Sequence, residues 1–352
     1  MAVEIPTKQT AAWIKNPGPD YELLIRNDID VGVPSPQEIL VKLEYSGICH
    51  SDCHNVIGQG KYTDIPGHEG VGIVVQLGSE ADPNLLGKRV GIKWQWSNCK
   101  TCAACKKGQH NHCPNQGNTG RTVRGTLQQY ILARADCVTM IPEGVPSEVA
   151  APLLCAGLSL AGAVSRLEPE VKPGEWVAIV GAGGGLGHIG VQIASNKGYK
   201  VIAIDGGEEK KKLCKDMGAE TFVDFTKVDV VETVKSLTDD EGAHAVICVA
   251  GSEKAYEQAV MLVRNTGVFV VVGLPPLTFM FPMSPLPIAN RGLIIKGSSV
   301  GTNEQMDDLL QQVLAGKITP RIEVYDFEDS PKIIAELLRY EVTGRKVVKA
   351  PQ

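Results

Sequence analysis

Between residues 174 and 273 the sequence alternates short apolar runs with segments of helical spacing. The apolar runs are VAIV, VIAI, TFVDF, AVICVA and VFVVVG, and the helical segments between them end near Lys197, Met217, Leu237 and Arg264. Strands that are apolar along nearly their whole length are typical of a parallel sheet with helices on both faces. This part of the chain is therefore predicted to be a doubly wound α/β domain.

A glycine-rich turn joins the first of these strands to the first helix, in the sequence VAIVGAGGGLGHIGVQIA. Such glycines let the backbone approach a pyrophosphate, which the amide groups at the helix N-terminus favour. The spacing has one residue more than the usual fingerprint, but Asp205 follows Gly187 by eighteen residues, where a carboxylate would accept hydrogen bonds from the adenosine ribose. The same carboxylate would repel a 2′-phosphate, so NAD is predicted rather than NADP. The alternative is that Asp205 is only a turn former at a strand end.

The residues before this domain show a different sequence pattern. From about Ile39 to Arg134, short β-type runs are separated by Gly, Pro and Asn, which predicts an irregular, mostly antiparallel β domain. After Gly297 come two helical patterns and a short β-like KVVK, which could pack back on the first domain. The predicted division is residues 1–156, 157–296 and 297–352.

Four cysteines lie within fifteen residues, in the sequence CKTCAACKKGQHNHC. Spacings of two residues let successive sulfurs converge on one ion, and four thiolates close a tetrahedral zinc shell that has no open position. Two alternatives remain. The first is an iron–sulfur cluster, which the Pro that follows Cys113 suggests, although the last gap is seven residues where the ferredoxin motif has three. The second is that the four thiols are unliganded.

A second group of metal-binding residue types is dispersed: Cys49 in GICHSDCH, His68 and Glu69 in GHEG, and Cys155 in PLLCAG. Two thiolates and one imidazole leave zinc a fourth position for water or substrate, which is the arrangement of a catalytic site. Each residue taken alone is as well explained by packing. Their weight comes from their sequence contexts, taken together with the dinucleotide turn.

Composition excludes several classes of function. A formal net charge of -5 without a long Lys/Arg stripe argues against nucleic-acid binding. The N-terminus has no secretory pattern, and prolines interrupt the longest apolar region, from Val268 to Ala289, too often for a membrane helix. A cytoplasmic location is therefore expected, where ten cysteines are more readily explained by metals than by disulfides.

Together these motifs, with Asp205-Gly206-Gly207 and the terminal GRKVV, resemble the zinc-containing medium-chain alcohol dehydrogenases over essentially the whole chain, and most closely their cytosolic yeast-type branch. The resemblance implies a GroES-like catalytic domain that carries two zinc ions and a Rossmann domain that binds NAD, with the active site in the cleft between them. It also implies a homotetramer and reversible oxidation of a small primary alcohol such as ethanol to the aldehyde, with formation of NADH.

The resemblance assigns site residues one by one. Cys49, His68 and Cys155 match the catalytic zinc ligands, and Glu69 matches a carboxylate that can exchange onto the metal. The structural zinc set is Cys99, Cys102, Cys105 and Cys113. Dinucleotide contacts are expected at Gly184, Gly185, Leu186, Asp205, Lys210, Phe225, Val300 and Arg345.

The implied chemistry uses zinc to stabilise the alkoxide while hydride leaves toward the nicotinamide. Ser51 stands where most yeast-type members carry Thr and keeps the hydroxyl that a proton relay needs. His54 is suited to exchange that proton near neutral pH, with a structural surface histidine as the alternative. His50 is expected to contact the cofactor phosphates, and all three residues to border the cofactor.

Substrate choice depends on the pocket. Trp94, in GIKWQW, matches a position where an aromatic ring narrows the pocket for short primary alcohols, although such a ring can simply be core. The rival within the family is an enzyme for a polyol, a secondary alcohol or a cinnamyl-type alcohol. From another class, a non-catalytic zinc-stabilised binding protein would explain the four clustered cysteines but not the second group or the glycine turn.

Overall fold

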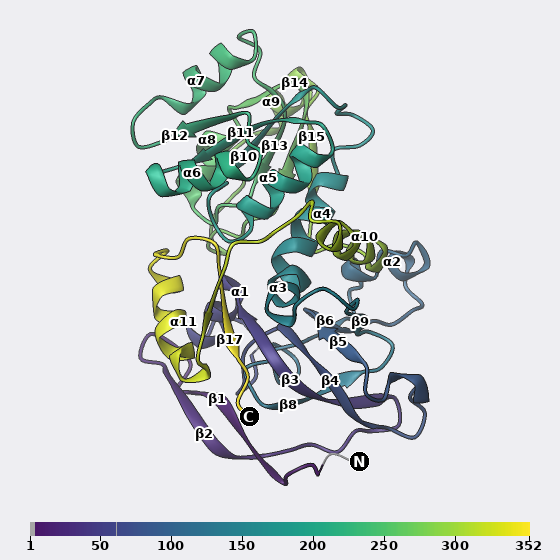
Figure 1. Cartoon of the computed structure of the whole chain (residues 1–352). Coiled ribbons are helices and arrows are strands. Elements are labelled where there is room, and N and C mark those ends of the chain that lie inside the picture. The colour runs from purple at the N-terminus through teal and green to yellow at the C-terminus, as the bar shows by residue number, and fades with distance from the viewer. Residues whose placement is uncertain (1–3, 61) are drawn as a thin grey trace. The chain divides into compact units, whose positions relative to one another are not determined.

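The computed structural model describes residues 4–60 and 62–352, which form two compact units (Figure 1). The first unit comprises the chain up to Cys155 together with Thr302–Leu314 and Pro320–Gln352. The second comprises Ala156–Gly301 and Ala315–Thr319. The first unit is thus discontinuous in sequence.

The first unit is built on a seven-stranded sheet that is mostly antiparallel, as predicted. Its long strand β3 (Glu38–Ile48) pairs antiparallel with β4 (Glu69–Leu77), β8 (Tyr130–Arg134) and β17 (Arg345–Lys349), so the C-terminal strand lies beside β3. The other strands of the sheet are β5 (Arg89–Ile92), β9 (Thr139–Met140) and β16 (Ile322–Tyr325). Two separate pairs are β1 (Lys8–Lys15) with β2 (Glu22–Asp30) and β6 (Gln95–Ser97) with β7 (Gly117–Asn118).

The first unit also contains helices and short helical turns. The first, α1 (His50–Val56), begins directly after β3 and packs against α11 (Ser330–Leu338) through Cys53, Val56 and Ile334. This packing fixes the start of α1, where Cys49 is the N-cap. The remaining helices are α2 (Ala103–Lys106), α3 (Ser147–Pro152), α10 (Asn303–Leu314), the π turn η3 (Leu153–Gly157) and the 3-10 turns η1 (Pro83–Leu85), η2 (His110–His112) and η4 (Phe327–Asp329).

The second unit contains a six-stranded parallel sheet in the order β12-β11-β10-β13-β14-β15, which confirms the predicted doubly wound fold. Figure 1 shows helices on both faces of this sheet. The strands are β10 (Trp176–Val180), β11 (Lys200–Asp205), β12 (Thr221–Asp224), β13 (Ala243–Cys248), β14 (Val263–Val271) and β15 (Ile294–Gly297). The helices are α4 (Leu158–Ser165), α5 (Gly187–Asn196), α6 (Glu208–Asp216), α7 (Val230–Leu237), α8 (Glu253–Ala259) and α9 (Pro285–Arg291).

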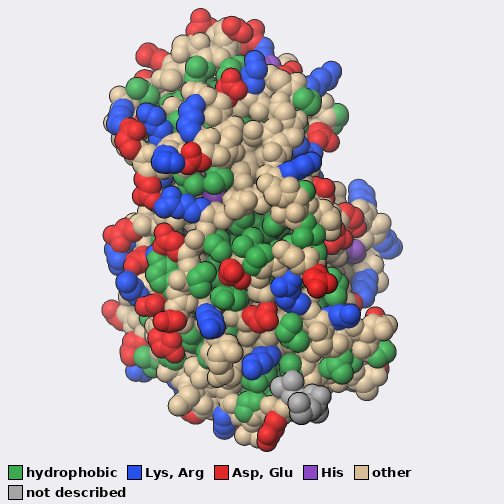
Figure 2. All heavy atoms as spheres, viewed as in Figure 1, with side chains coloured by type: hydrophobic (Ala, Val, Ile, Leu, Met, Phe, Trp, Pro, Cys, Tyr) green, Lys and Arg blue, Asp and Glu red, His purple; other side chains and the backbone are tan. Residues whose placement is uncertain are grey.

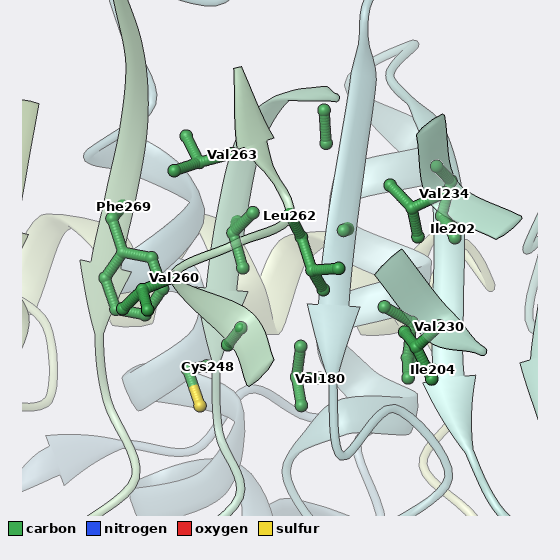
Figure 3. Packing of buried hydrophobic residues seen from close by; sticks show 14 of the residues in the cluster. Val180, Ile202, Ile204, Val230, Val234, Cys248, Val260, Leu262, Val263 and Phe269 are labelled. Atoms are coloured by element: carbon green, nitrogen blue, oxygen red, sulfur yellow. The ribbon is translucent and has the colours of Figure 1, made fainter. Parts of the chain in front are cut away.

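Apolar packing holds the helices to the sheet in this unit. Val230 and Val234 of α7 meet Ile202 and Ile204 of β11, and Phe269 of β14 belongs to the same cluster (Figure 3). Each fully buried aliphatic or aromatic side chain contributes about 1.5–3 kcal/mol relative to an exposed one. The cluster therefore fixes β11, and with it the strand end that carries Asp205.

The structure corrects two sequence expectations. The helix predicted to run through Arg264 ends at Ala259, because Val263 already pairs with Ala243 as the start of β14. Strand β15 adds a sixth strand that the proline-rich region before it concealed. The N-terminal pair β1 and β2 also belongs to the first unit and precedes the β-type runs noted from about Ile39.

Two features of the structure concern possible membrane and nucleic-acid partners. One continuous helical run, Ser147–Ser165, is long and apolar enough to cross a membrane, but 83% of its apolar window is buried within the protein. Buried core helices pass the same test. Figure 2 shows Lys and Arg side chains scattered among Asp and Glu on the visible face, where they form no continuous basic stripe.

Candidate metal centres and dinucleotide turn

Four metal-binding side chains from distant parts of the sequence meet in the first unit. The ligand atoms of Cys49, His68, Glu69 and Cys155 all lie within 4.8 Å of one another, and all four residues are buried. Cys49 caps α1, His68 and Glu69 stand at the start of β4, and Cys155 lies in the π turn η3. The dispersed set predicted from sequence is therefore brought together.

The separations in this set match a tetrahedral zinc shell. The Sγ atoms of Cys49 and Cys155 are 3.9 Å apart, and Nε2 of His68 is 3.2 Å from Sγ of Cys155. With Zn–S bonds of about 2.3 Å, two sulfurs of a tetrahedral site stand about 3.7 Å apart. Two thiols and an imidazole are the donors that zinc prefers, so the residues present fit the metal.

Asp52, which the sequence analysis did not identify, makes three hydrogen-bond contacts that position this set. Its fully buried carboxylate accepts hydrogen bonds from the backbone N–H groups of Cys49 (2.8 Å) and Gly67 (3.1 Å). The same carboxylate lies 2.8 Å from Nδ1 of His68. Because Asp52 accepts, Nδ1 carries a proton, and Nε2 is the ring nitrogen that faces the sulfurs and can bind a metal. The sequence signal that could have identified Asp52 is its place as an acidic residue at the third position of a helix whose N-cap is the ligand Cys49.

Glu69 does not stand free beside the set, because Arg345 binds it. Nη2 of Arg345 donates to both carboxylate oxygens at 2.5 Å, and both residues are buried. Gly47 makes this possible, since a Cβ there would stand 2.0 Å from Oε2 of Glu69. Nε of Arg345 is buried without a hydrogen-bond partner in the described part of the chain. Its expected cofactor contact stays a prediction.

Burial and mutual charge shift the ionisation of these groups. Burial raises the pKa of Glu69 to about 7, against the opposing charge of Arg345. The hydrogen bond from Cys155 holds the pKa of the Cys49 thiol well below its usual value, and the same bond raises that of Cys155. Burial alone would lower the pKa of His68, but the Asp52 carboxylate outweighs it and the pKa is raised. One thiol of the pair is thus poised as a thiolate, the form that binds metal.

The three predicted relay and cofactor residues all lie on the first turns of α1. The His50 ring stacks on Tyr340 with centroids 4.8 Å apart and meets the His54 ring edge-on at 5.8 Å. Partial burial, with the charge of His50, lowers the pKa of His54. Ser51 follows His50 in the sequence and is half-buried. Their roles in proton transfer and cofactor binding stay predictions.

Trp94 lies next to the metal set. Its ring meets the His68 ring edge-on with centroids 5.2 Å apart, and the residue is half-buried rather than part of the core. A large ring beside a metal ligand limits the space for a substrate. The sequence-based interpretation of Trp94 as a pocket residue is compatible with this position.

The four clustered cysteines form a second compact set. The thiols of Cys99, Cys102, Cys105 and Cys113 lie within 4.8 Å of one another. Backbone N–H groups point at three of the sulfurs: Cys102 donates to Cys99, Cys105 to Cys102, and Cys99 to Cys113, at 3.3–3.4 Å. Such N–H donors, with that of Thr101 the largest, lower the pKa of Cys99 to about 5. Four converging thiols with thiolate-stabilising donors fit a closed zinc site.

The glycine-rich turn of the second unit connects β10 to α5. Gly187 is required there, because a Cβ would stand 2.1 Å from the carbonyl oxygen of Gly181. The Asp205 carboxylate accepts from the N–H of Gly183 at 2.9 Å and from Nζ of Lys210 at 2.9 Å. Asp205 thus shapes the turn itself and pairs with Lys210, two contacts that the sequence did not reveal.

The other predicted dinucleotide residues also have defined positions. Gly184, Gly185 and Leu186 lead into α5, with Leu186 as its N-cap. Phe225 is 54% exposed directly after β12, and Val300 has a left-handed backbone with φ of 46°. An exposed aromatic ring beside Asp205 suits a stacking contact.

Comparison with known proteins gives a consistent picture. Residues 185–315 match the zinc-binding dehydrogenase family model, and residues 35–143 match the alcohol dehydrogenase GroES-like domain. The chain is 40% identical to alcohol dehydrogenase 1 of Emericella nidulans over 99% of this chain and 100% of that protein. The structure is similar to the alcohol dehydrogenase of Aeropyrum pernix (TM-score 0.86, 28% identity, 97% and 99% of the two chains). It is also similar to acetophenone reductase from Geotrichum candidum in complex with NAD (TM-score 0.85, 26% identity, 99% and 98%).

Proposed function

Since this chain belongs to the family of zinc-binding alcohol dehydrogenases, we propose that it transfers hydride reversibly between a small, ethanol-like primary alcohol and NAD, giving the aldehyde and NADH. The observation that carries the proposal is the buried set of Cys49, His68 and Cys155 with Glu69. Bound there, zinc supplies a Lewis acid for the alcohol oxygen, and NAD supplies the hydride acceptor. A second zinc at the four-cysteine set stabilises its lobe.

The chain's own residues prepare this chemistry. Asp52 fixes the His68 ring so that Nε2 faces the metal position. Arg345 holds Glu69 in place and compensates its charge at the buried site. Ser51 accepts the proton released from the alcohol and passes it on, and His54 exchanges it with water. A lowered pKa keeps His54 neutral, and therefore able to accept a proton, at neutral pH.

NAD is favoured by the turn in the second unit. The Gly184-Gly185-Leu186 segment brings backbone N–H groups to the start of α5, where a pyrophosphate is favoured. Asp205 is the proposed acceptor for the ribose hydroxyls. The NAD complex of the similar acetophenone reductase supports this choice of cofactor.

The test of the proposal is the absorbance of NADH during incubation of metal-replete protein with NAD and a series of alcohols. We expect the highest kcat/KM for ethanol among methanol through hexanol, lower values for isopropanol and a polyol, and loss of activity after chelation. A preference for a secondary alcohol or a polyol would replace the substrate but keep the reaction. Failure to reduce NAD with any alcohol would contradict the proposal and favour a non-catalytic zinc-stabilised protein.

We also propose that the chain acts in the cytoplasm as a homotetramer, without nucleic-acid or membrane partners. Large apolar side chains on the second unit support assembly, since Leu277 and Met280 are 97% and 81% exposed. Size-exclusion chromatography with light scattering is expected to give four times the chain mass of 37.7 kDa. A mass near one chain would contradict the assembly and leave the reaction untouched.

A further inference from the structure

Two carboxylates end neighbouring strands of the parallel sheet in the second unit. Asp205 is the last residue of β11, Asp224 is the last residue of β12, and the two pair directly in register. Directly paired residues of adjacent parallel strands point to the same face. Both are buried, at 6% and 9% exposure. A group bound at Asp205 therefore lies close to Asp224 as well.

Asp224 is surrounded by donors of the kinds that bind phosphate. One oxygen accepts from the backbone N–H of Thr226 at 3.0 Å and from its hydroxyl at 2.6 Å. The other accepts from the backbone N–H of Gly207 at 3.2 Å and lies 3.4 Å from Nζ of Lys227. Gly207 is also the N-cap of α6, and nothing lies within 4 Å of the place where its Cβ would stand.

Two backbone N–H groups, a hydroxyl and an ammonium group around one point make an anion site. In this chain the anion is the chain's own carboxylate. The hydroxyl of Thr226 is the main cause that lowers the pKa of Asp224 to about 2, so the group is charged at neutral pH. Lys227 is further occupied by Glu208 at 2.7 Å, which leaves no free cation for a second anion at this point among the residues described here.

We propose that Asp224 is a second specificity residue, which excludes NADP by filling the anion site that a 2′-phosphate would need. The proposal rests on the proposed binding of NAD at Asp205 and extends it. Its consequence is that removing the Asp205 carboxylate alone leaves the donors around Asp224 occupied and the negative charge of Asp224 in place. A single substitution at Asp205 should therefore give only a weak gain for the phosphorylated cofactor.

The experiment measures binding of two fragments that lack nicotinamide, 5′-AMP and 2′,5′-ADP, by calorimetry at fixed ionic strength. Asp205→Ser is expected to weaken 5′-AMP binding and to improve 2′,5′-ADP binding slightly. Adding Asp224→Asn should tighten 2′,5′-ADP by roughly tenfold more, because one like charge leaves and a neutral amide holds the surrounding donors less strongly than the carboxylate does. Adding Asp216→Asn instead, at the exposed far end of α6, removes the same formal charge and should give no such gain.

A third substitution separates anion binding from a general structural effect. Thr226→Val in the Asp205→Ser and Asp224→Asn background removes the hydroxyl donor of this site and should reverse most of the gain, with unchanged affinity for 5′-AMP. Melting temperatures check the fold, and Asp224→Ser replaces Asp224→Asn if the amide proves unstable. A folded double variant that binds 2′,5′-ADP no better than Asp205→Ser overturns the proposal. If the unmodified protein binds neither 5′-AMP nor NAD, the proposed function fails as well.

Discussion

Replacing Cys49 by Ser is expected to remove one zinc ion per chain and nearly all turnover while the fold is kept. Cys49 is buried, and its sulfur lies 3.9 Å from that of Cys155, so its thiolate is one of the few donors that the site offers. A serine hydroxyl has nearly the same size, but it stays protonated and is a poor zinc ligand. Loss of a metal that contributes several kcal/mol to the transition state lowers kcat by about a thousandfold or more.

The measurement combines zinc content, kcat and thermal unfolding. Zinc should fall from two ions to one, because the four-cysteine set is separate and keeps its own four thiols. Cys53→Ala is the matched control, since Cys53 lies four residues further along, is fully buried in the apolar cluster between α1 and α11, and makes one long 3.7 Å hydrogen bond to the carbonyl of Ile334. That variant should lose roughly 1 kcal/mol of stability and keep both zinc ions. An active Cys49→Ser protein would contradict the ligand assignment.

The sequence could indicate the two candidate metal sets because their residue types are uncommon and chemically restricted. Cys99 to Cys113 lie within one short segment, so spacing alone indicated convergence. Cys49, His68 and Cys155 are far apart, and only their sequence contexts linked them. The parallel sheet was equally accessible, since its central strands are apolar along their length and glycine or a helix separates them.

Other features depend on contacts that no local pattern encodes. Arg345 and Glu69 are separated by 276 positions, and their pairing requires that β17 lie beside β3 and that residue 47 lack a side chain. Strand β15 has four residues after a stretch broken by prolines, so it carries too little periodicity to be recognised. Asp224 has no sequence signal of its own, because its donors come from Gly207, Thr226 and Lys227 and converge only in the folded chain.

Asp52 is the clearest case of a residue whose importance appears only in three dimensions. Three donors surround its carboxylate: N–H groups of Cys49 and Gly67, and Nδ1 of His68. Two of them come from a loop distant in sequence, and all are buried with the carboxylate. A carboxylate can only accept hydrogen bonds, so it suits a position that faces three donors. It therefore fixes both the backbone geometry at Cys49 and the tautomer of His68.

Asp52→Asn is therefore expected to weaken zinc at this site by about 10-fold to 100-fold, the range typical for partners of ligating histidines. If the amide nitrogen faces His68, Nδ1 must accept, the proton moves to Nε2, and the lone pair that faces the sulfurs is lost. If the amide nitrogen faces Cys49, two N–H donors oppose each other and displace that ligand's backbone. Neither orientation of the asparagine preserves the arrangement.

The effect is measured by titrating the protein with a zinc chelator while both zinc content and NAD reduction are followed. In the Asp52→Asn variant, activity should disappear at a lower chelator concentration than in the unmodified chain, while the second zinc is released at the same concentration. Asp28→Asn is the control, since it makes the same chemical change at an exposed carboxylate that binds only Arg26. Equal release curves for the Asp52 variant and the unmodified protein would show that the carboxylate does not orient His68, because a tautomer fixed by Asp52 cannot survive the amide without a loss of metal affinity.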